Sequence, residues 1–126
     1  MKNAMISIFL FLSIMILIYF ANNSLLKLCG RITTLSEDIE ITLTQDNFEE
    51  AYTQSIQLMN LIQSEGFITS IYVNHQDFDI LVNDAVKLSV YLTYKDAEDA
   101  DATLHSLKYN AQNIKKLQIP TLENIL

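Results

Sequence analysis

The sequence predicts an all-α protein in which a single N-terminal transmembrane helix continues into a stalk and then an up-down antiparallel helical bundle. The first reason is that residues 4–21 form an uncharged, almost wholly apolar run, AMISIFLFLSIMILIYFA. The second is that the chain has only two glycines and one proline in 126 residues, whereas β-rich folds need frequent turn residues. The third is that apolar residues in the rest of the chain recur at the helical spacing of three and four.

The apolar run is long enough to cross a bilayer. As a helix it rises about 27 Å, which is close to the hydrocarbon thickness of a membrane. Tyr19 and Phe20 lie at its end, where aromatic rings favour the membrane interface. The predicted membrane-spanning residues include Ala4, Phe11, Ile16 and Ala21.

Two other interpretations of the run fit the residues less well. A cleaved signal peptide needs small residues before the cut, and the nearest candidate, Tyr19-Phe20-Ala21, has a large residue at the first position. A lipoprotein needs small residues just before the modified cysteine, but Leu28 precedes Cys29. The sequence therefore favours an uncleaved signal anchor in the cell membrane.

The orientation of the anchor depends on a small difference in charge. Lys2 precedes the span, and Lys27 and Arg31 follow it. The numbers of basic residues on the two sides, which set the orientation under the positive-inside rule, are therefore nearly equal. A short N-terminal tail usually stays in the cytoplasm. We therefore expect a single-pass protein with its N-terminus in the cytoplasm and its domain outside.

The chain divides by composition into residues 1–23, a transmembrane anchor, and residues 24–126, an acidic helical bundle with a C-terminal apolar tail. The net charge is −7, and all the acidic residues follow residue 36. Such a surface repels phosphate, so we expect no nucleic-acid partner. The single cysteine excludes an intrachain disulfide framework.

Polar breaks separate the expected helices. Asp46 with Glu49 resembles a capping box, Asp77 is expected to cap the third helix, and Asp96 with Asp99 the last. Residues 67–73 have high β propensity, but no second alternating run exists to pair with them, so we interpret them as helix continuing past Gly66. The last helix is expected to end before Pro120, because proline pushes the preceding residue to extended geometry.

Each expected helix carries an apolar face. In the stalk it has heptad spacing, and this seam either packs inside the chain's own bundle or forms an intermolecular coiled coil that would make a homo-oligomer. The stalk seam is Leu25, Leu28, Ile32, Leu35, Ile39, Thr42 and Leu43. The other faces are Phe48, Ala51/Tyr52, Ser55, Leu58/Met59 and Leu61/Ile62; then Ile80/Leu81, Asp84/Ala85, Leu88 and Tyr91/Leu92; then Ala97, Ala100, Leu104, Leu107, Ala111, Ile114 and Leu117.

No group of residues predicts a catalytic or metal site. His75 with Asp77 and Asp79 lacks the central glycine and distal glutamate of a calcium loop, so the two acids are interpreted as first-turn residues of a helix. Asp101 and His105 lie one turn apart, but the sequence offers no third ligand spaced to join them. We expect no cofactor, no metal and no enzymatic activity.

Surface features are open to two interpretations each. The acidic cluster near residues 96–101 suits a helix N-terminus or a docking surface for a basic partner. Lys27 and Arg31 lie where they could contact anionic lipid headgroups. In the C-terminal TLENIL, Leu122, Ile125 and Leu126 either fold back to close one end of the bundle or dock onto another protein.

Several segments resemble the DUF4363 family, small uncharacterised membrane proteins of Gram-positive, endospore-forming bacteria. They are NHQDFDIL, Leu88 with VYL, the Lys-Asp turn after them, and the terminal IPTLENIL, together with the N-terminal anchor and the chain length. The family has no assigned activity, so the resemblance supplies no catalytic residue. It implies that His75 and the terminal Asn124, Ile125 and Leu126 serve a structural or interaction role.

Two classes of function are consistent with these features. The favoured one is a membrane-anchored, non-enzymatic protein-interaction or structural module at the cell envelope, whose partners are the lipid bilayer and another membrane or envelope protein. The alternative is an extracytoplasmic helical bundle that senses a small ligand. Specific thermal stabilisation by a small molecule would distinguish the second class from the first.

Overall fold

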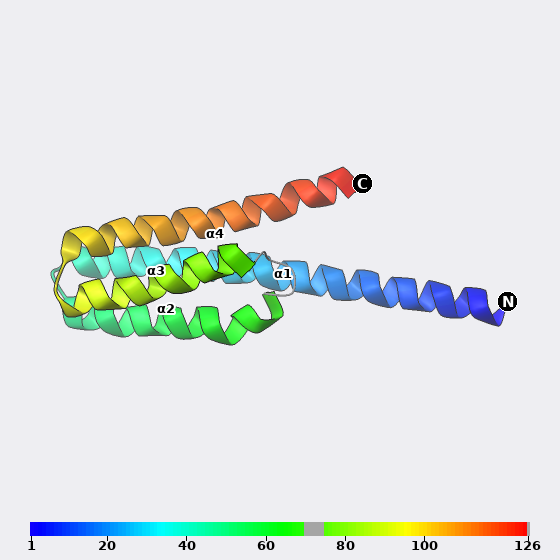
Figure 1. Cartoon of the computed structure of the whole chain (residues 1–126), viewed down its shortest axis with the longest axis horizontal. Helices are drawn as coiled ribbons and strands as arrows, with labels where there is room; N and C mark the ends of the chain where they lie inside the picture. The colour runs from blue at the N-terminus through cyan, green and yellow to red at the C-terminus, as the bar shows by residue number, and fades with distance from the viewer. Residues whose placement is uncertain (70–74, 126) are drawn as a thin grey trace.

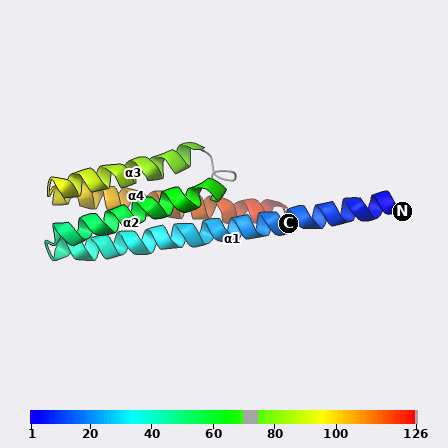
Figure 2. The same cartoon turned by 90° about the horizontal axis from the view of Figure 1, so that it is seen from below.

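Four helices pack as an up-down antiparallel bundle in the computed structural model. The structure describes the backbone of residues 1–69 and 75–125, and the side chains of residues 1–65 and 76–116. The helices are α1 (Lys2–Thr44), α2 (Phe48–Thr69), α3 (His75–Thr93) and α4 (Ala97–Ile125). Each helix packs against the next along the chain, and α4 packs back against α1 (Figures 1 and 2). The all-α bundle prediction is therefore confirmed.

The anchor and the stalk are one uninterrupted helix. Neither Asn22-Asn23 nor Gly30 breaks α1, whose 43 residues rise about 64 Å. Figure 1 shows its N-terminal part projecting well beyond the bundle. We call the end of the bundle from which it projects the near end, and the end that holds the two turns at residues 45–47 and 94–96 the far end.

The projecting part of α1 exposes apolar side chains on every side. Phe11 is 63% exposed and Ile16 is 55% exposed, and Ala4 is exposed as well. Among the described residues, α1 is the one helix long and apolar enough to cross a membrane. An all-round apolar surface is unfavourable in water and compatible with hydrocarbon, so this segment suits a single-pass anchor.

Burial in α1 begins at Ala21 and then follows the predicted heptad seam. The seam lies inside the chain's own bundle, between α2 and α4, rather than on a surface open to a second chain. Leu35 is half-buried and packs against the core. The buried seam residues are Leu25, Leu28, Ile32, Ile39, Thr42 and Leu43.

The faces predicted for the other helices supply most of the rest of the core. The buried residues there are Ala51, Ser55, Leu58, Leu61, Ile62, Leu81, Ala85, Leu88, Leu92, Ala100, Leu104, Leu107, Ala111 and Ile114. Three predicted core positions are wrong: Tyr52 and Ile80 are 41% and 43% exposed, and Ala97 is exposed. Tyr52 and Ile80 stand beside Ala51 and Leu81, which take the inward position of each pair.

The first turn corrects the predicted cap of α2. Asp46 adopts a left-handed conformation with φ 55°. Its N–H donates to the carbonyl of Leu43, and the N–H of Asn47 donates to the carbonyl of Thr42, which is the Schellman arrangement. Asn47 is then the N-cap, since its Oδ1 accepts from the N–H of Glu50 at 3.2 Å. The predicted Asp46 cap is wrong by one residue because an aspartate tolerates the left-handed position that ends α1.

The second turn repeats this geometry. Lys95 has φ 57°, and the predicted cap Asp96 is confirmed, because its Oδ1 accepts from the N–H of Asp99 at 3.2 Å. The predicted Asp77 cap of α3 is wrong. Helix α3 already begins at His75, so Asp77 lies inside its first turn, where the helix dipole favours a negative charge.

The ends of α2 and α4 test two further predictions. Helix α2 continues past Gly66 to Thr69, as expected, and the rest of the segment predicted as helix lies outside the described residues. The extended geometry predicted at Ile119 is wrong, because α4 runs through Pro120 to Ile125. Proline removes one backbone hydrogen bond, to the carbonyl of Lys116. Lys116 is exposed, so water can replace the missing donor.

We expect Ile39→Ala to destabilise the bundle by about 2–5 kcal/mol, because the Ile39 side chain is fully buried and its removal leaves a cavity. Ile41→Ala is the matched control, since Ile41 lies on the same helix and is 58% exposed. Thermal unfolding of the full chain in detergent micelles measures both variants. Equal losses of stability at the two positions would contradict the packing of α1 described above.

Candidate functional site

The two ends of the bundle differ sharply in charge. At the far end, residues 37–50 and 95–101 contain one basic residue, Lys95. The acidic residues of these ranges are Glu37, Asp38, Glu40, Asp46, Glu49, Glu50, Asp96, Glu98, Asp99 and Asp101. We call this group the acidic tip. The antiparallel topology creates it by bringing the end of α1, the start of α2 and the start of α4 together.

The crowding of charge at the tip affects the pKa of the Asp99 carboxyl. A side-chain hydrogen bond with Asp96 raises the pKa of the Asp99 carboxyl, and the negative charges of Asp96 and Glu98 raise it further. A proton therefore binds Asp99 more readily in the folded protein than in the unfolded chain. The stability that this group contributes is present at acidic pH and decreases as the pH rises through the raised pKa.

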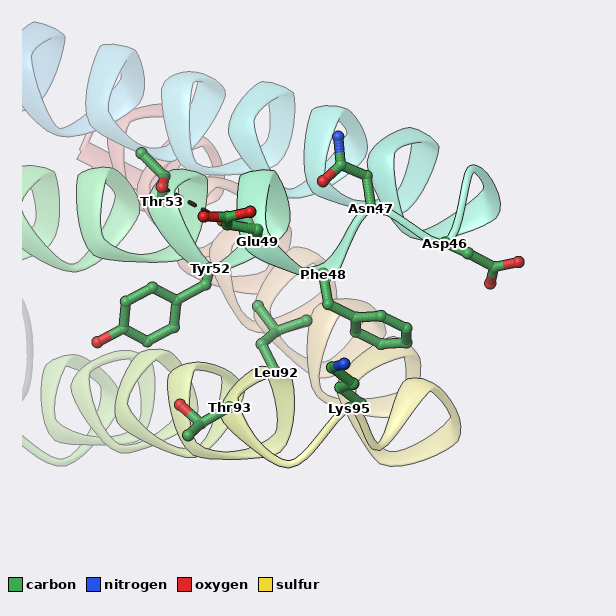
Figure 3. A pocket seen from close by; sticks show the side chains of 9 residues that line it. All are labelled: Asp46, Asn47, Phe48, Glu49, Tyr52, Thr53, Leu92, Thr93 and Lys95. Carbon is green, nitrogen blue, oxygen red and sulfur yellow. Dashed lines mark hydrogen bonds between the residues drawn. The ribbon is translucent and has the colours of Figure 1, made fainter.

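An open groove of about 770 Å³ lies at the acidic tip between α2 and α3. Figure 3 shows the rings of Phe48 and Tyr52 extending from α2 toward α3, with the side chain of Leu92 between them. The groove is lined by Asp46, Asn47, Phe48, Glu49, Tyr52, Thr53, Leu92, Thr93 and Lys95. The hydroxyl of Thr53 donates to the carbonyl oxygen of Glu49, so it is already satisfied within α2.

The groove presents apolar and acidic groups side by side. Two aromatic rings and a leucine offer apolar contact, while Asp46 and Glu49 offer carboxylates at the edge. A segment with apolar and basic side chains complements both halves of this surface.

A second cluster joins α1 to α4 near the acidic tip. The ammonium of Lys108 donates to Oε2 of Glu40 at 3.0 Å and lies 2.7 Å from Oε1. Both side chains are largely buried, at 20% and 22% exposed. Asp101 and His105 form the predicted contact one helical turn apart, with 3.6 Å between Oδ2 and Nε2.

The fold brings Glu40 to the Asp101–His105 pair, which the sequence pattern did not indicate because Glu40 lies on a different helix. One ligand atom from each of the three residues lies within 4.8 Å of the others. A metal ion here would have to displace Lys108, which already neutralises Glu40 at 2.7 Å. The arrangement therefore works as a cross-helix ion pair.

The cysteine is an unreactive core residue. Burial raises the pKa of the Cys29 thiol to about 11, and the nearby charge of Lys115 lowers it only in part. The thiolate, which is the reactive form, is therefore scarce at neutral pH. This geometry gives Cys29 no role in a functional site.

The sequence-predicted interaction residues lie at the near end. His75 begins α3, and Leu122, Asn124 and Ile125 belong to the last turns of α4, while their side chains and Leu126 lie outside the described residues. Both views place the C-terminus toward the end from which α1 projects (Figures 1 and 2). The backbone of the tail continues as helix α4, and the packing predicted for its side chains lies outside the described residues.

Comparison with protein families finds one that covers most of the chain. Residues 19–125 match the model of a family described as a domain of unknown function, DUF4363. The chain belongs to the DUF4363 family. The DUF4363 match covers the bundle and the last residues of the apolar run. Comparisons with curated proteins and with solved structures gave no match.

We expect Lys108→Met to destabilise the protein by about 1–3 kcal/mol, because it leaves the largely buried carboxylate of Glu40 without its cation. The double variant Glu40→Gln/Lys108→Met removes both charges and should recover most of this loss. Denaturant unfolding of the single and double variants gives the coupling energy. A double variant as unstable as the sum of the two single variants would show that the pair is not coupled.

Proposed function

We propose that this chain is a single-pass, membrane-anchored, non-enzymatic protein that docks a partner protein at its acidic tip. The all-round apolar surface of the N-terminal part of α1 supports the anchor. The observation that carries the docking role is the groove at the tip, where the exposed ring of Tyr52 and the half-buried ring of Phe48 lie beside several carboxylates. The partner on this proposal is a membrane or envelope protein with a basic, partly apolar segment.

The unbroken α1 supports this arrangement by fixing the distance between bilayer and tip. From Ala21 to Thr44 the helix rises about 35 Å, which is greater than the depth of a headgroup layer. The tip on this proposal stands clear of the membrane, where a second protein can approach it. We infer that the bundle serves as a rigid spacer as well as a docking surface.

Self-association through the stalk is less well supported. The heptad seam that would pair two chains is occupied by α2 and α4 of the same chain. A homo-oligomer would therefore have to use another surface. The tail residues near Ile125 lie at the near end, so any contact they make is separate from the groove.

Sensing of a small ligand remains the alternative, with less support. Small-molecule sites usually bury most of the ligand in a concave cavity. The groove at the tip and the smaller hollows on α1 are open to solvent in the part of the chain that the structure describes. An open groove suits a segment of a protein better than a small molecule.

The orientation that we propose places the N-terminus in the cytoplasm and the bundle outside. We expect Asp101→Cys, in a Cys29→Ser background, to react with a membrane-impermeant maleimide on intact cells, because Asp101 has 56% of its side chain exposed. The chain with Cys29 alone is the control, and its buried thiol should stay unlabelled. Labelling of Asp101→Cys only after permeabilisation would place the bundle in the cytoplasm.

Docking at the tip is tested by site-specific photo-crosslinking in cells. A benzophenone amino acid at Tyr52, in the groove, should give a discrete adduct with one partner protein. The same group at Tyr109, which is 70% exposed on α4, should not. Charge reversal by Glu49→Lys/Glu50→Lys should reduce the Tyr52 adduct several-fold, because it opposes a basic partner. Equal adducts from both tyrosines, or an adduct insensitive to charge reversal, would argue against docking at the tip.

A further inference from the structure

Several basic residues lie at the near end of the bundle, opposite the acidic tip, and share that end with Glu65, Asp77 and Asp79. Lys27 and Arg31 lie on α1, a few residues after the apolar run. Lys115 on α4 lies against the same stretch, since a small hollow between the two helices is lined by Cys29, Gly30, Thr33, Ala111, Gln112 and Lys115. We call Lys27, Arg31 and Lys115 the basic belt.

An open hollow lies on α1 beside Lys27 and Arg31. It has a volume of about 520 Å³ and is lined by Lys27, Gly30, Arg31, Thr34 and Leu35. A Cβ atom built on Gly30 would meet no heavy atom within 4 Å. Packing therefore does not require a glycine there, although glycine is disfavoured in the middle of a helix. The hollow has a largely apolar floor and two cations at its rim.

On the proposed anchor, Lys27 is the belt residue nearest the membrane surface along α1. Lys27 lies about 9 Å and Arg31 about 15 Å beyond Ala21 along α1, by the helical rise. Side chains on a helix lean toward its N-terminus, which here is toward the bilayer, and long basic side chains extend to the headgroups. Headgroup layers are about 5–8 Å deep on each side of the hydrocarbon. The Lys27 ammonium therefore reaches this layer.

Arg31 keeps donors free for a further ligand. Its Nη1 donates to Oε1 of Glu65 at 2.6 Å, and its side chain is 60% exposed. A guanidinium has five N–H donors in a planar fork, so one bond to a carboxylate leaves others for a phosphate.

We propose that Lys27 and Arg31 of the basic belt bind the phosphate of an anionic phospholipid of the same bilayer that holds α1, with the headgroup seated over Gly30. This inference rests on the proposed membrane anchor and names a partner for the near end. The acidic tip supports the choice of a lipid over a nucleic acid, because it would repel a long polyanion lying along the bundle.

The test uses the full chain in nanodiscs of equal phosphatidylcholine and phosphatidylglycerol. Native mass spectrometry of the released protein gives the ratio of the two lipids that stay bound. We expect phosphatidylglycerol to be enriched. Lys27→Gln and Arg31→Gln should each lower its ratio about fivefold, which is the usual effect of one basic residue at an anionic surface.

Two further variants separate a lipid site from a general effect of charge. Gly30→Leu should also lower the ratio, because it fills the hollow without changing the net charge. Lys87→Gln should leave the ratio unchanged, since Lys87 is an exposed lysine in the second half of α3, toward the far end. Millimolar inorganic phosphate should not displace the bound lipid.

The outcomes are distinguishable. No enrichment of phosphatidylglycerol, or equal losses in Lys27→Gln and Lys87→Gln, overturns the lipid site while leaving the anchor intact. Displacement by free phosphate overturns it in favour of a soluble anion. Extraction of the chain from membranes by alkaline carbonate would overturn the proposed membrane anchor. The proposed lipid site would then be overturned as well, because it rests on the anchor.

Discussion

The packing of α1 between α2 and α4 is the interaction on which the rest of the structure depends. Its seam, including the fully buried Ile32 and Ile39, contacts both neighbours, and within the described residues α3 packs against α2 and α4 but not against α1. Burying that seam supplies the hydrophobic stabilisation of the core. It also fixes the bundle axis to the axis of the apolar segment, because both belong to one helix. The positions of the basic belt and the acidic tip relative to a bilayer follow from this one helix.

Charge along the bundle is ordered by topology rather than by local sequence. Acids favour the first turns of helices, and two helices of this bundle, α2 and α4, begin at the same end. The antiparallel arrangement therefore gathers Glu49, Glu50, Glu98 and Asp99 at one place. Helix macrodipoles account for these first-turn acids one helix at a time. They do not account for Glu37, Asp38 and Glu40, which lie near the C-terminal end of α1.

Much of the fold was predictable from periodicity, and much of the candidate site was not. The apolar run and the seam of α1 follow from spacing alone, because a helix repeats every 3.6 residues. The caps at Asp46 and Asp77 were misplaced because several polar residues adjoin each break, and only backbone geometry selects one of them. The path through Pro120 runs against the local preference of proline, which removes a backbone hydrogen bond. The cluster of Glu40 with Asp101 and His105 could not be predicted, because Glu40 lies on α1 and the other two residues on α4. The groove at Tyr52 could not be predicted for the same reason, since α2 and α3 form it together.

The continuity of α1 has a mechanical consequence. A helix without a hinge between the apolar segment and the bundle transmits any inclination of one to the other. Membrane helices commonly incline by about 20° from the bilayer normal, which would carry the far end sideways by about 12 Å over its height of about 35 Å. The bundle then acts as a lever, and a change in bilayer thickness or in a neighbouring helix would move the acidic tip without any rearrangement of its core.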